Sequence, residues 1–254
     1  MTRTNNWQDK VAIITGGSSG IGRALALALA SNGAKVLVTG RNEARLADMS
    51  DSHGSIETLK ADSCEPASAK RIIESATDRW GRLDLIVNNA GAGQPLQIAD
   101  YDAGLIAKMA AVNIIGPSLL LKEGHAALRA SQGAIVNVGS AVSRNAVPMV
   151  AHYAATKAAL EHLTRSWAVA LASDGIRVNA IAPGPVKSGA LTGMMGLPDE
   201  VAQQIEAQET RQIPLGRRGI PADIVAWVLR LGSPENEWLT GQVLTVDGGW
   251  TLRT

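Results

Sequence analysis

The stretch Val11–Gly22 reads VAIITGGSSGIG, and the organisation of the chain can be worked out from it. Its first four residues, VAII, are apolar and mostly β-branched, which predicts a strand buried on both faces. The stretch Arg23–Ala30 (RALALALA) follows the glycines without a breaker and consists of strong helix formers. Strand, glycine turn and helix together present free backbone N–H groups and a helix dipole to a diphosphate.

The glycines follow the spacing Thr15-Gly16-x-x-x-Gly20-x-Gly22 rather than the commoner G-x-G-x-x-G. Glycine suits such a turn because a side chain would keep the backbone away from the ligand. A glycine cluster alone is also compatible with a tight turn that binds nothing. The variant spacing directly after an amino-terminal strand resembles the nucleotide loop of the short-chain dehydrogenase/reductase family. That resemblance implies a cofactor-binding loop made of Gly16, Ser18, Ser19, Gly20, Ile21 and Gly22.

Length and composition indicate one large α/β domain over residues 1–254. The chain is 46% hydrophobic and 19% charged, with a formal net charge of +1. No basic run stands out, which argues against a nucleic-acid partner. The amino terminus lacks a hydrophobic leader region, and we expect no apolar run of transmembrane length and no membrane partner. The single cysteine, Cys64, excludes an intrachain disulfide and fits a reducing cytosol, so we expect a cytoplasmic protein.

The second predicted strand, Lys35–Thr39, ends at a position that bears on the choice of cofactor. Folds that prefer NAD place an acidic residue there to accept from the ribose 2′-OH. This chain has no carboxylate at that place and has Arg41 immediately after it. A guanidinium can bind a 2′-phosphate through charge-assisted hydrogen bonds. We therefore expect preference for NADP(H), the alternative being that Arg41 is a solvated loop residue.

Alternating apolar runs and helical stretches predict a doubly wound, Rossmann-type fold with a mostly parallel seven-stranded sheet. The remaining expected strands are 56–60, 83–87, 134–139, 177–181 and 242–246. Asp62 follows the third strand. The resemblance implies that it contacts the adenine, and by pattern it could also cap the helix that opens near Pro66. The amides of Asn88-Asn89-Ala90-Gly91 can satisfy backbone groups of neighbouring strand ends and line a crevice. N-N-A-G is a motif of the same family, which implies cofactor contacts for Asn89, Ala90 and Gly91.

The expected chemistry lies around the fifth strand and the helix after it. Ser140 follows that strand at its carboxyl end, where open α/β sheets bind ligands. Tyr153 and Lys157 are four residues apart in a helical stretch and so share one face. A nearby ammonium lowers the pKa of a phenol towards the working pH, and a serine hydroxyl can hold a carbonyl oxygen as charge develops on it. Each feature alone is weak, since Ser140 could simply cap the strand end.

The motifs occur in the order and spacing of the short-chain dehydrogenase/reductase family, and the resemblance covers essentially the whole chain. It implies the catalytic set Asn113, Ser140, Tyr153 and Lys157, with Asn113 disturbing a helix and holding a water in a proton relay. The alternative for Asn113 is a local kink. Tyr153 and Lys157 also count as cofactor contacts. The resemblance adds the segment after the sixth strand, namely Pro183, Gly184, Val186 and Ser188, in which serine replaces the usual threonine.

The connection 189–214 is expected to form the substrate loop, partly helical and interrupted by glycines. Its residues Met194 and Met195 suit a pocket lid, although ordinary packing is equally compatible. An apolar pocket is expected from Leu96, Val142, Val147, Met194 and Met195. The four histidines show no metal-ligand spacing, so no metal site is predicted. The family resemblance implies a homotetramer or a homodimer.

These observations predict an NADP(H)-dependent oxidoreductase of the EC 1.1.1 type. It would interconvert a ketone and a secondary alcohol, with Tyr153 as the acid/base. A carbonyl reductase and a 3-oxoacyl reductase both fit, because no residue demands a thioester carrier and the apolar pocket also suits cyclic or aryl ketones. The alternatives are an NAD-dependent alcohol, polyol or sugar dehydrogenase, which the missing carboxylate disfavours, and a non-catalytic dinucleotide sensor, which would not need Tyr153 and Lys157.

Overall fold

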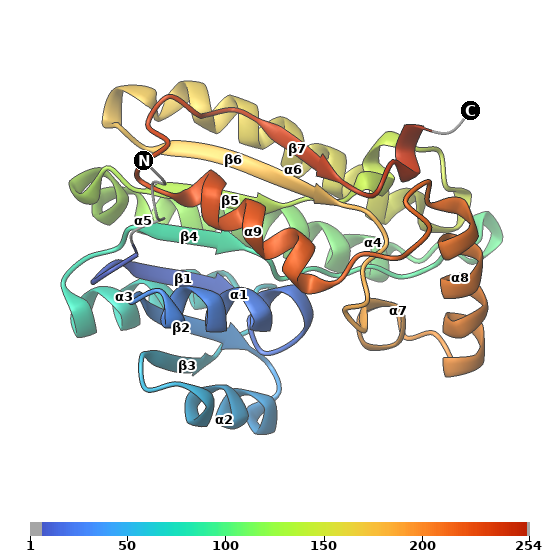
Figure 1. Ribbon diagram of the computed structural model, residues 1–254, viewed down its shortest axis with the longest axis horizontal. Coiled ribbons are helices and arrows are strands. Elements are labelled where there is room, and N and C mark those ends of the chain that lie inside the picture. Colours follow the sequence, from blue (N-terminus) through green and yellow to red (C-terminus); the bar gives the residue numbers. More distant parts are fainter. Residues whose placement is uncertain (1–6, 253–254) are drawn as a thin grey trace.

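The structure is a computed structural model that describes residues 7–252. Residues 1–6 lie outside the described residues. The prediction that the amino terminus lacks a hydrophobic leader region therefore falls partly on residues that the structure does not describe. The described residues form one seven-stranded sheet in the order β3-β2-β1-β4-β5-β6-β7, with every neighbouring pair parallel (Figure 1). The strands are β1 (Val11–Thr15), β2 (Lys35–Gly40), β3 (Ile56–Lys60), β4 (Leu85–Asn88), β5 (Ala134–Val138), β6 (Arg177–Pro183) and β7 (Val243–Val246).

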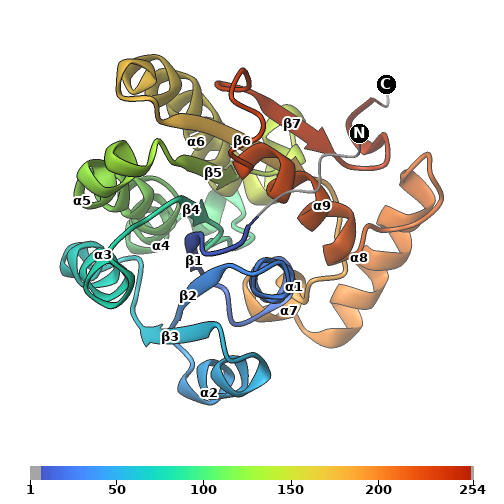
Figure 2. The same ribbon diagram turned by 60° about the vertical axis from the view of Figure 1, so that its left-hand side comes forward.

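Helices cover both faces of this sheet, which confirms the doubly wound fold. Helices α1, α2 and α9 pack on one face, and α3, α5 and α6 pack on the other (Figure 2). Helices α7 and α8 lie beyond the carboxyl ends of the strands (Figure 1). The helix bounds are α1 (Gly20–Ser31), α2 (Glu43–Ser52), α3 (Pro66–Trp80), α4 (Ala103–Ala110), α5 (Gly116–Ser131), α6 (Ala151–Ala170), α7 (Ala190–Gly193), α8 (Asp199–Gln212) and α9 (Pro221–Gly232).

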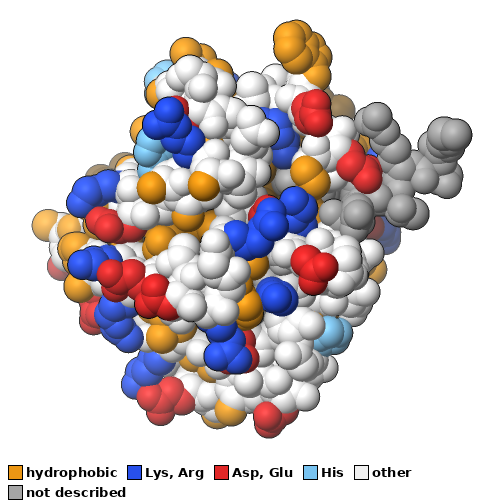
Figure 3. All heavy atoms as spheres, turned by 90° about the vertical axis from the view of Figure 1, so that its left-hand side faces the viewer, with side chains coloured by type: hydrophobic (Ala, Val, Ile, Leu, Met, Phe, Trp, Pro, Cys, Tyr) orange, Lys and Arg blue, Asp and Glu red, His pale blue; other side chains and the backbone are white. Residues whose placement is uncertain are grey.

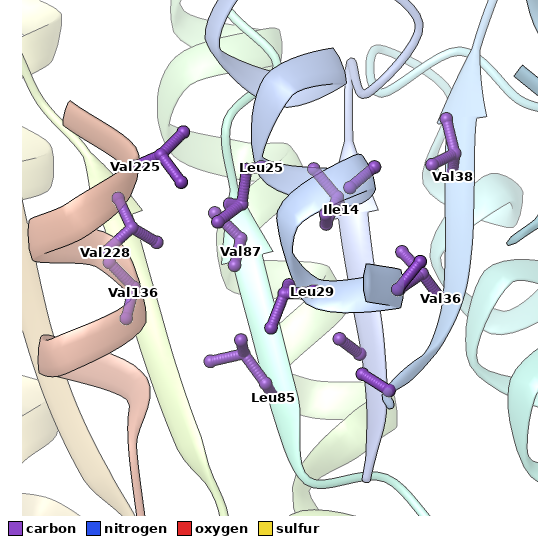
Figure 4. Packing of buried hydrophobic residues seen from close by; sticks show 14 of the residues in the cluster. Ile14, Leu25, Leu29, Val36, Val38, Leu85, Val87, Val136, Val225 and Val228 are labelled. Carbon is purple, nitrogen blue, oxygen red and sulfur yellow. The ribbon is translucent and has the colours of Figure 1, made fainter. Parts of the chain in front are cut away.

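The strand at the centre of the sheet explains why its sequence is apolar throughout. In β1, Ala12 and Ile14 face the α1 and α9 layer, whereas Val11 and Ile13 face the layer of α3 and α5. All four are buried, and burying such an aliphatic side chain contributes about 2 kcal/mol. Figure 4 shows Ile14 and the other labelled side chains of β2, β4 and β5 meeting those of α1 and α9. Packing on both faces therefore holds the end of β1, and the turn that follows it, in one place.

The sequence predicted no apolar run of transmembrane length, and by length and composition this prediction is wrong. The continuous helical stretch Ala103–Ser131 is long and apolar enough to cross a membrane. One such helix is weak evidence, because a core helix passes the same test. Here Leu120 and Leu128 of this stretch pack with Ile86 of β4 in the core. Only 28% of the apolar window is buried within the chain, so these core contacts account for part of its apolar residues.

The two ends of the sheet differ in what covers them. The carboxyl ends of the strands lie towards α7 and α8, where open α/β sheets bind ligands (Figure 1). The opposite face, at the amino ends of the strands, carries lysine or arginine and aspartate or glutamate side chains interspersed with one another (Figure 3). The loops that follow the strands, which carry the candidate site residues, therefore lie at the carboxyl end of the sheet, and the loops that precede the strands lie at the opposite end.

Candidate active site

The turn between β1 and α1 requires glycine at three of its positions. Gly16 and Gly20 have φ angles of +63° and +54°, a conformation that other residues rarely adopt. At Gly22 a Cβ atom would lie 2.5 Å from Asn89 Nδ2 and 2.6 Å from the Gly16 carbonyl oxygen. The glycine spacing read from the sequence thus has a structural reason at each position.

Asn89 holds this turn in place from the neighbouring strand β4. Its side-chain Nδ2 donates to the carbonyl oxygens of Thr15 at 2.9 Å and of Gly16 at 3.0 Å. The backbone N–H groups of Asn89 and Ala90 in turn donate to Thr15 Oγ1 at 3.1 Å and 3.0 Å. The prediction that these amides satisfy backbone groups at neighbouring strand ends is confirmed for Asn89, whereas the Asn88 side chain donates to the Asn137 side chain. Direct contact of Asn89, Ala90 and Gly91 with a cofactor stays a prediction.

The residues of the turn fit a dinucleotide diphosphate. Ser19 is the N-cap residue of α1, and its side chain makes no capping hydrogen bond. The first turn of α1 carries no acidic residue. The N–H groups at this end of α1 and its dipole are therefore open to an anion. Across the crevice, the carbonyl oxygen of Ser188 would lie 2.9 Å from a Cβ atom at Gly20. A side chain at Gly20 would thus fill the space between the turn and the segment after β6.

Arg41 and Asp62 lie at the carboxyl ends of β2 and β3. Arg41 is exposed and follows Gly40, whose Cβ position would be 3.0 Å from Ser18 Oγ of the glycine turn. Asp62 Oδ1 accepts from the Cys64 backbone N–H at 2.9 Å. Burial raises the pKa of the Cys64 thiol, and the Asp62 carboxylate raises it further. The Arg41 guanidinium lowers this pKa, so Arg41 and Asp62 both lie near the turn that holds Cys64.

The alternative prediction that Asp62 caps helix α3 is wrong. The residue at the N-cap of α3 is Glu65, and Pro66 is the first residue of the helix. Asp62 instead holds the turn before it, because its backbone carbonyl also accepts from the Glu65 N–H. The cap and the turn are only three residues apart, and sequence pattern does not separate them. Adenine contact by Asp62 remains a prediction.

Asn113 lies inside a π-helical turn, Ala111–Ile115, between α4 and α5. Its Oδ1 accepts from the Ala92 N–H at 2.9 Å, and its Nδ2 donates to the Ala92 carbonyl and to Thr156 Oγ1, both at 2.8 Å. The side chain is fully buried. The predicted disturbance of the helix is confirmed, and its cause is that Asn113 binds the segment after β4 and helix α6. Such π-turns occur frequently at functional sites.

A second set of buried hydrogen bonds between side chains was not predicted from the sequence. Asn88 Nδ2 donates to Asn137 Oδ1 at 2.7 Å, and Asn137 Nδ2 donates to Thr164 Oγ1 at 2.9 Å. These contacts join β4, β5 and α6 below the site. The only sequence signal was an asparagine inside the apolar strand β5, where a polar side chain needs buried partners.

Ser140, Tyr153 and Lys157 come together at the carboxyl end of β5. The Ser140 hydroxyl lies close enough to the Tyr153 phenol to act on its pKa, which it lowers. Lys157 Nζ donates to the carbonyl oxygen of Val138, the last residue of β5, at 2.8 Å and lies 5.8 Å from the centre of the Tyr153 ring. A Cβ atom at Gly91 would be 3.6 Å from Lys157 Nζ and 3.8 Å from Asn113 Oδ1. All four predicted catalytic residues therefore border one space beside the N-N-A-G segment.

The electrostatics of the pair differ from the sequence expectation. Burial raises the pKa of the Tyr153 phenol, and the Ser140 hydroxyl opposes that rise. Burial lowers the pKa of the Lys157 ammonium to about 8, and the Glu161 carboxylate acts in the opposite direction. The sequence reasoning expected the ammonium to bring the pKa of Tyr153 down, but desolvation raises it instead. Tyr153 therefore holds its proton at neutral pH and can donate it.

The segment after β6 is braced by a residue that the sequence reasoning did not single out. Gly184 packs against Asp247, and its N–H donates to the Val246 carbonyl at 3.0 Å. The Val186 carbonyl accepts from the buried guanidinium of Arg218 at 3.1 Å. Arg218 also forms ion pairs with Glu206 and Glu209 of α8. The guanidinium thus joins the predicted substrate loop to the predicted nicotinamide segment, which includes Pro183 and Ser188.

The expected apolar pocket residues cluster around Tyr153. Leu96, Val142, Val147, Met194 and Met195 all pack in the same cluster as its ring. A Cβ atom at Gly93 would lie 2.9 Å from Tyr153 Cδ2 and 3.3 Å from Met194 Cε, so glycine allows this close packing. Trp250 belongs to the same cluster and was missed, because its position close to the carboxyl terminus gave no indication that the chain returns to the site.

Comparison with known proteins adds a relationship over the whole chain. A family model described as enoyl-(acyl carrier protein) reductase matches residues 16–251. The chain is also similar to 2-(S)-hydroxypropyl-CoM dehydrogenase 3 of Xanthobacter autotrophicus. The two are 35% identical over 253 residues, which cover 98% of this chain and 99% of that protein.

Two solved structures have the same fold. One is a short-chain dehydrogenase/reductase of unknown function from Caenorhabditis elegans with cofactor, at a TM-score of 0.91 and 34% identity; the match covers 98% of this chain and 97% of that one. The other is the 3-ketoacyl-(acyl-carrier-protein) reductase of Brucella melitensis complexed with NADH. It matches at a TM-score of 0.89 and 29% identity, over 96% of this chain and 99% of that one.

Proposed function

Since this chain belongs to the short-chain dehydrogenase/reductase family, and is thus an oxidoreductase of alcohols and ketones, we propose that it reduces a ketone to a secondary alcohol with NADPH. The observation that carries this proposal is the convergence of Ser140, Tyr153 and Lys157 beside the apolar cluster of Leu96, Val142 and the two methionines. An acid, a hydroxyl donor and a cation next to an apolar surface are what carbonyl reduction requires.

Each residue of the set has a proposed role. NADPH, when bound, supplies the hydride. Ser140 donates a hydrogen bond to the carbonyl oxygen, and Tyr153 gives that oxygen its proton as negative charge develops. Lys157 supplies the positive charge beside the phenol and binds ribose hydroxyls. Asn113 fixes the segment at Ala92 to helix α6 and anchors the water of a proton relay. The phenol is protonated at neutral pH, as a proton donor in reduction requires.

The proposed cofactor is NADP(H), bound along the glycine turn. The exposed guanidinium of Arg41 would pair with the 2′-phosphate, close to Ser18. The nearest carboxylate along the chain after β2 is Glu43, and its Oε1 is already paired with Lys60 Nζ at 2.6 Å. No carboxylate in this turn is therefore left to select the 2′-OH of NAD.

A direct assay tests the activity, its cofactor and its substrate class together. The initial rate of NADPH oxidation is measured with an acetoacetyl thioester and with a bulky cyclic ketone, and both are repeated with NADH. We expect turnover with NADPH. Strong activity on the thioester supports a 3-oxoacyl reductase, and activity on the ketone alone supports a carbonyl reductase. Absence of turnover with either nucleotide on every ketone would contradict the proposal.

A second candidate is an NAD-linked alcohol dehydrogenase. It is favoured by the similar Brucella melitensis reductase, whose structure contains NADH, and by the Xanthobacter relative, whose name describes a dehydrogenase. The same assay separates the two candidates, because an NAD-linked enzyme would prefer NADH over NADPH. Arg41 would then lie in solvent and leave the cofactor unaffected.

We also propose that the enzyme works in the cytoplasm as a homotetramer, acting on small molecules without a nucleic-acid or membrane partner. The exposed apolar side chains Val169, Trp227, Trp238 and Leu252 support assembly, because they lie on the surface of one protomer. Light scattering of the purified protein should give a mass of about four chains. A stable monomer at micromolar concentration would contradict the assembly.

A further inference from the structure

One buried acidic side chain next to the site has no role in the reaction described above. Glu161 lies on α6, four residues beyond Lys157, and is only 7% exposed. Carboxylates are almost never buried to this extent unless other groups compensate their charge. The groups around Glu161 therefore indicate what its burial achieves.

The carboxylate of Glu161 contacts the segment that carries Ser140. Ser143 Oγ lies 2.7 Å from Glu161 Oε1 and 2.7 Å from the Ser140 carbonyl oxygen. A Cβ atom at Gly139 would be 3.1 Å from Glu161 Oε1, so glycine at this position lets the carboxylate approach the backbone. Through Ser143, Glu161 thus joins helix α6 to the backbone of Ser140, and it also lies close to Gly139.

The same carboxylate is part of the electrostatic surroundings of Lys157. Residues four apart share one helix face, so the Glu161 charge acts on the ammonium. This effect opposes the lowering of the Lys157 pKa by burial. Of the arginines near Glu161, Arg144 faces the carboxylate, with Nη2 at 3.9 Å from Oε2, whereas Arg165 Nη1 donates to the Glu161 backbone carbonyl at 3.4 Å. The Glu161 carboxylate is therefore a negative charge with Lys157 and Arg144 around it.

We propose that Glu161 is a positioning residue with two effects: it fixes the Ser140 segment to α6, and it keeps Lys157 in its charged form. The inference rests on the proposed reductase activity, in which Ser140 holds the carbonyl oxygen and Lys157 acts beside Tyr153. Glu161 itself touches neither the substrate nor the cofactor.

Two variants separate the two effects. Glu161→Gln retains an acceptor for Ser143 but removes the charge. In ketone reduction by the complete enzyme with saturating NADPH, the fall in kcat at high pH should move about one unit lower, because Lys157 loses its proton sooner. Ser143→Ala retains the charge but loses the link to Ser140. It should raise the KM for the ketone about tenfold while the pH profile stays in place.

Matched variants control for charge and folding. Glu74→Gln removes a carboxylate that pairs with Lys70 on the exposed face of α3, and it should leave both readouts unchanged. Glu161→Asp restores the charge and should bring the pH profile back towards that of the parent. If Glu161→Gln keeps the parental pH profile, or loses activity only in proportion to a lower melting temperature, its role is structural and the inference is wrong.

A second measurement does not depend on turnover. In protein with 13C-labelled lysine, the ε-carbon signal of Lys157, identified by its loss in Lys157→Met, reports protonation directly. It should titrate at lower pH in Glu161→Gln than in the parent, and equal titration overturns the inference. A parent enzyme that reduces no ketone instead contradicts the proposed function, so the two failures are distinguishable.

Discussion

Replacing Tyr153 by phenylalanine is expected to lower kcat for ketone reduction by about a thousandfold or more. Proton donation by a positioned side chain contributes about a hundred- to ten-thousandfold to such reactions. The phenol is buried close to Ser140, and its pKa is raised by burial, so it keeps its proton at neutral pH and is the proposed proton donor. The measurement is the rate of NADPH oxidation in single turnover and at steady state.

The variant should keep the fold and the cofactor site. Phenylalanine preserves the ring that packs against Gly93 and Met194. The dissociation constant for NADPH, measured by fluorescence, should therefore change by less than about threefold. If turnover survives in Tyr153→Phe, another group donates the proton and the assignment of the catalytic set is wrong.

The chain contains a matched control for this experiment. Tyr101 is the second of its two tyrosines; it is 43% exposed and lies edge-on against His152, at 4.5 Å between ring centres. Tyr101→Phe removes the same hydroxyl group from the surface and should leave kcat unchanged. Loss of activity in both variants would indicate a general effect on stability.

The fold could be predicted from the sequence because its main signals are local. The segments expected between helical stretches overlap all seven strands, most of them as apolar runs, and the glycine turn identified the first crossover. The bounds differ where pairing with a distant strand decides them. For example, β6 continues to Pro183 because that residue pairs with Val246.

The site was only partly predictable, because several of its contacts join residues far apart in the chain. Asn137, Arg218 and Trp250 contribute through partners on other elements, and no local pattern identifies those partners. The pKa of Tyr153 was expected to fall because Lys157 is near in sequence. Burial by the surrounding elements raises it instead, and burial is a property of the folded chain.

The proposed preference for NADP(H) rests on a single exposed side chain, so its test has the second largest expected effect. Arg41→Ala should raise the KM for NADPH about ten- to a hundredfold, because a charge-assisted hydrogen bond to a phosphate contributes about 1.5–3 kcal/mol. The kcat should stay nearly constant, because the 2′-phosphate is bound equally in the ground state and the transition state. The kinetics with NADH should not change.

Arg41→Asp should go further and reverse the preference. A carboxylate after β2 repels the 2′-phosphate and can accept from the 2′-OH of NADH, which is the arrangement of NAD-preferring folds. Because Glu43 is already paired with Lys60, the new carboxylate would be the one available for that contact. Arg79→Ala removes the same charge from an exposed residue at the carboxyl-terminal end of α3 and should change neither KM. Equal kcat/KM for NADPH in the parent and in Arg41→Ala would mean that the guanidinium does not bind the phosphate.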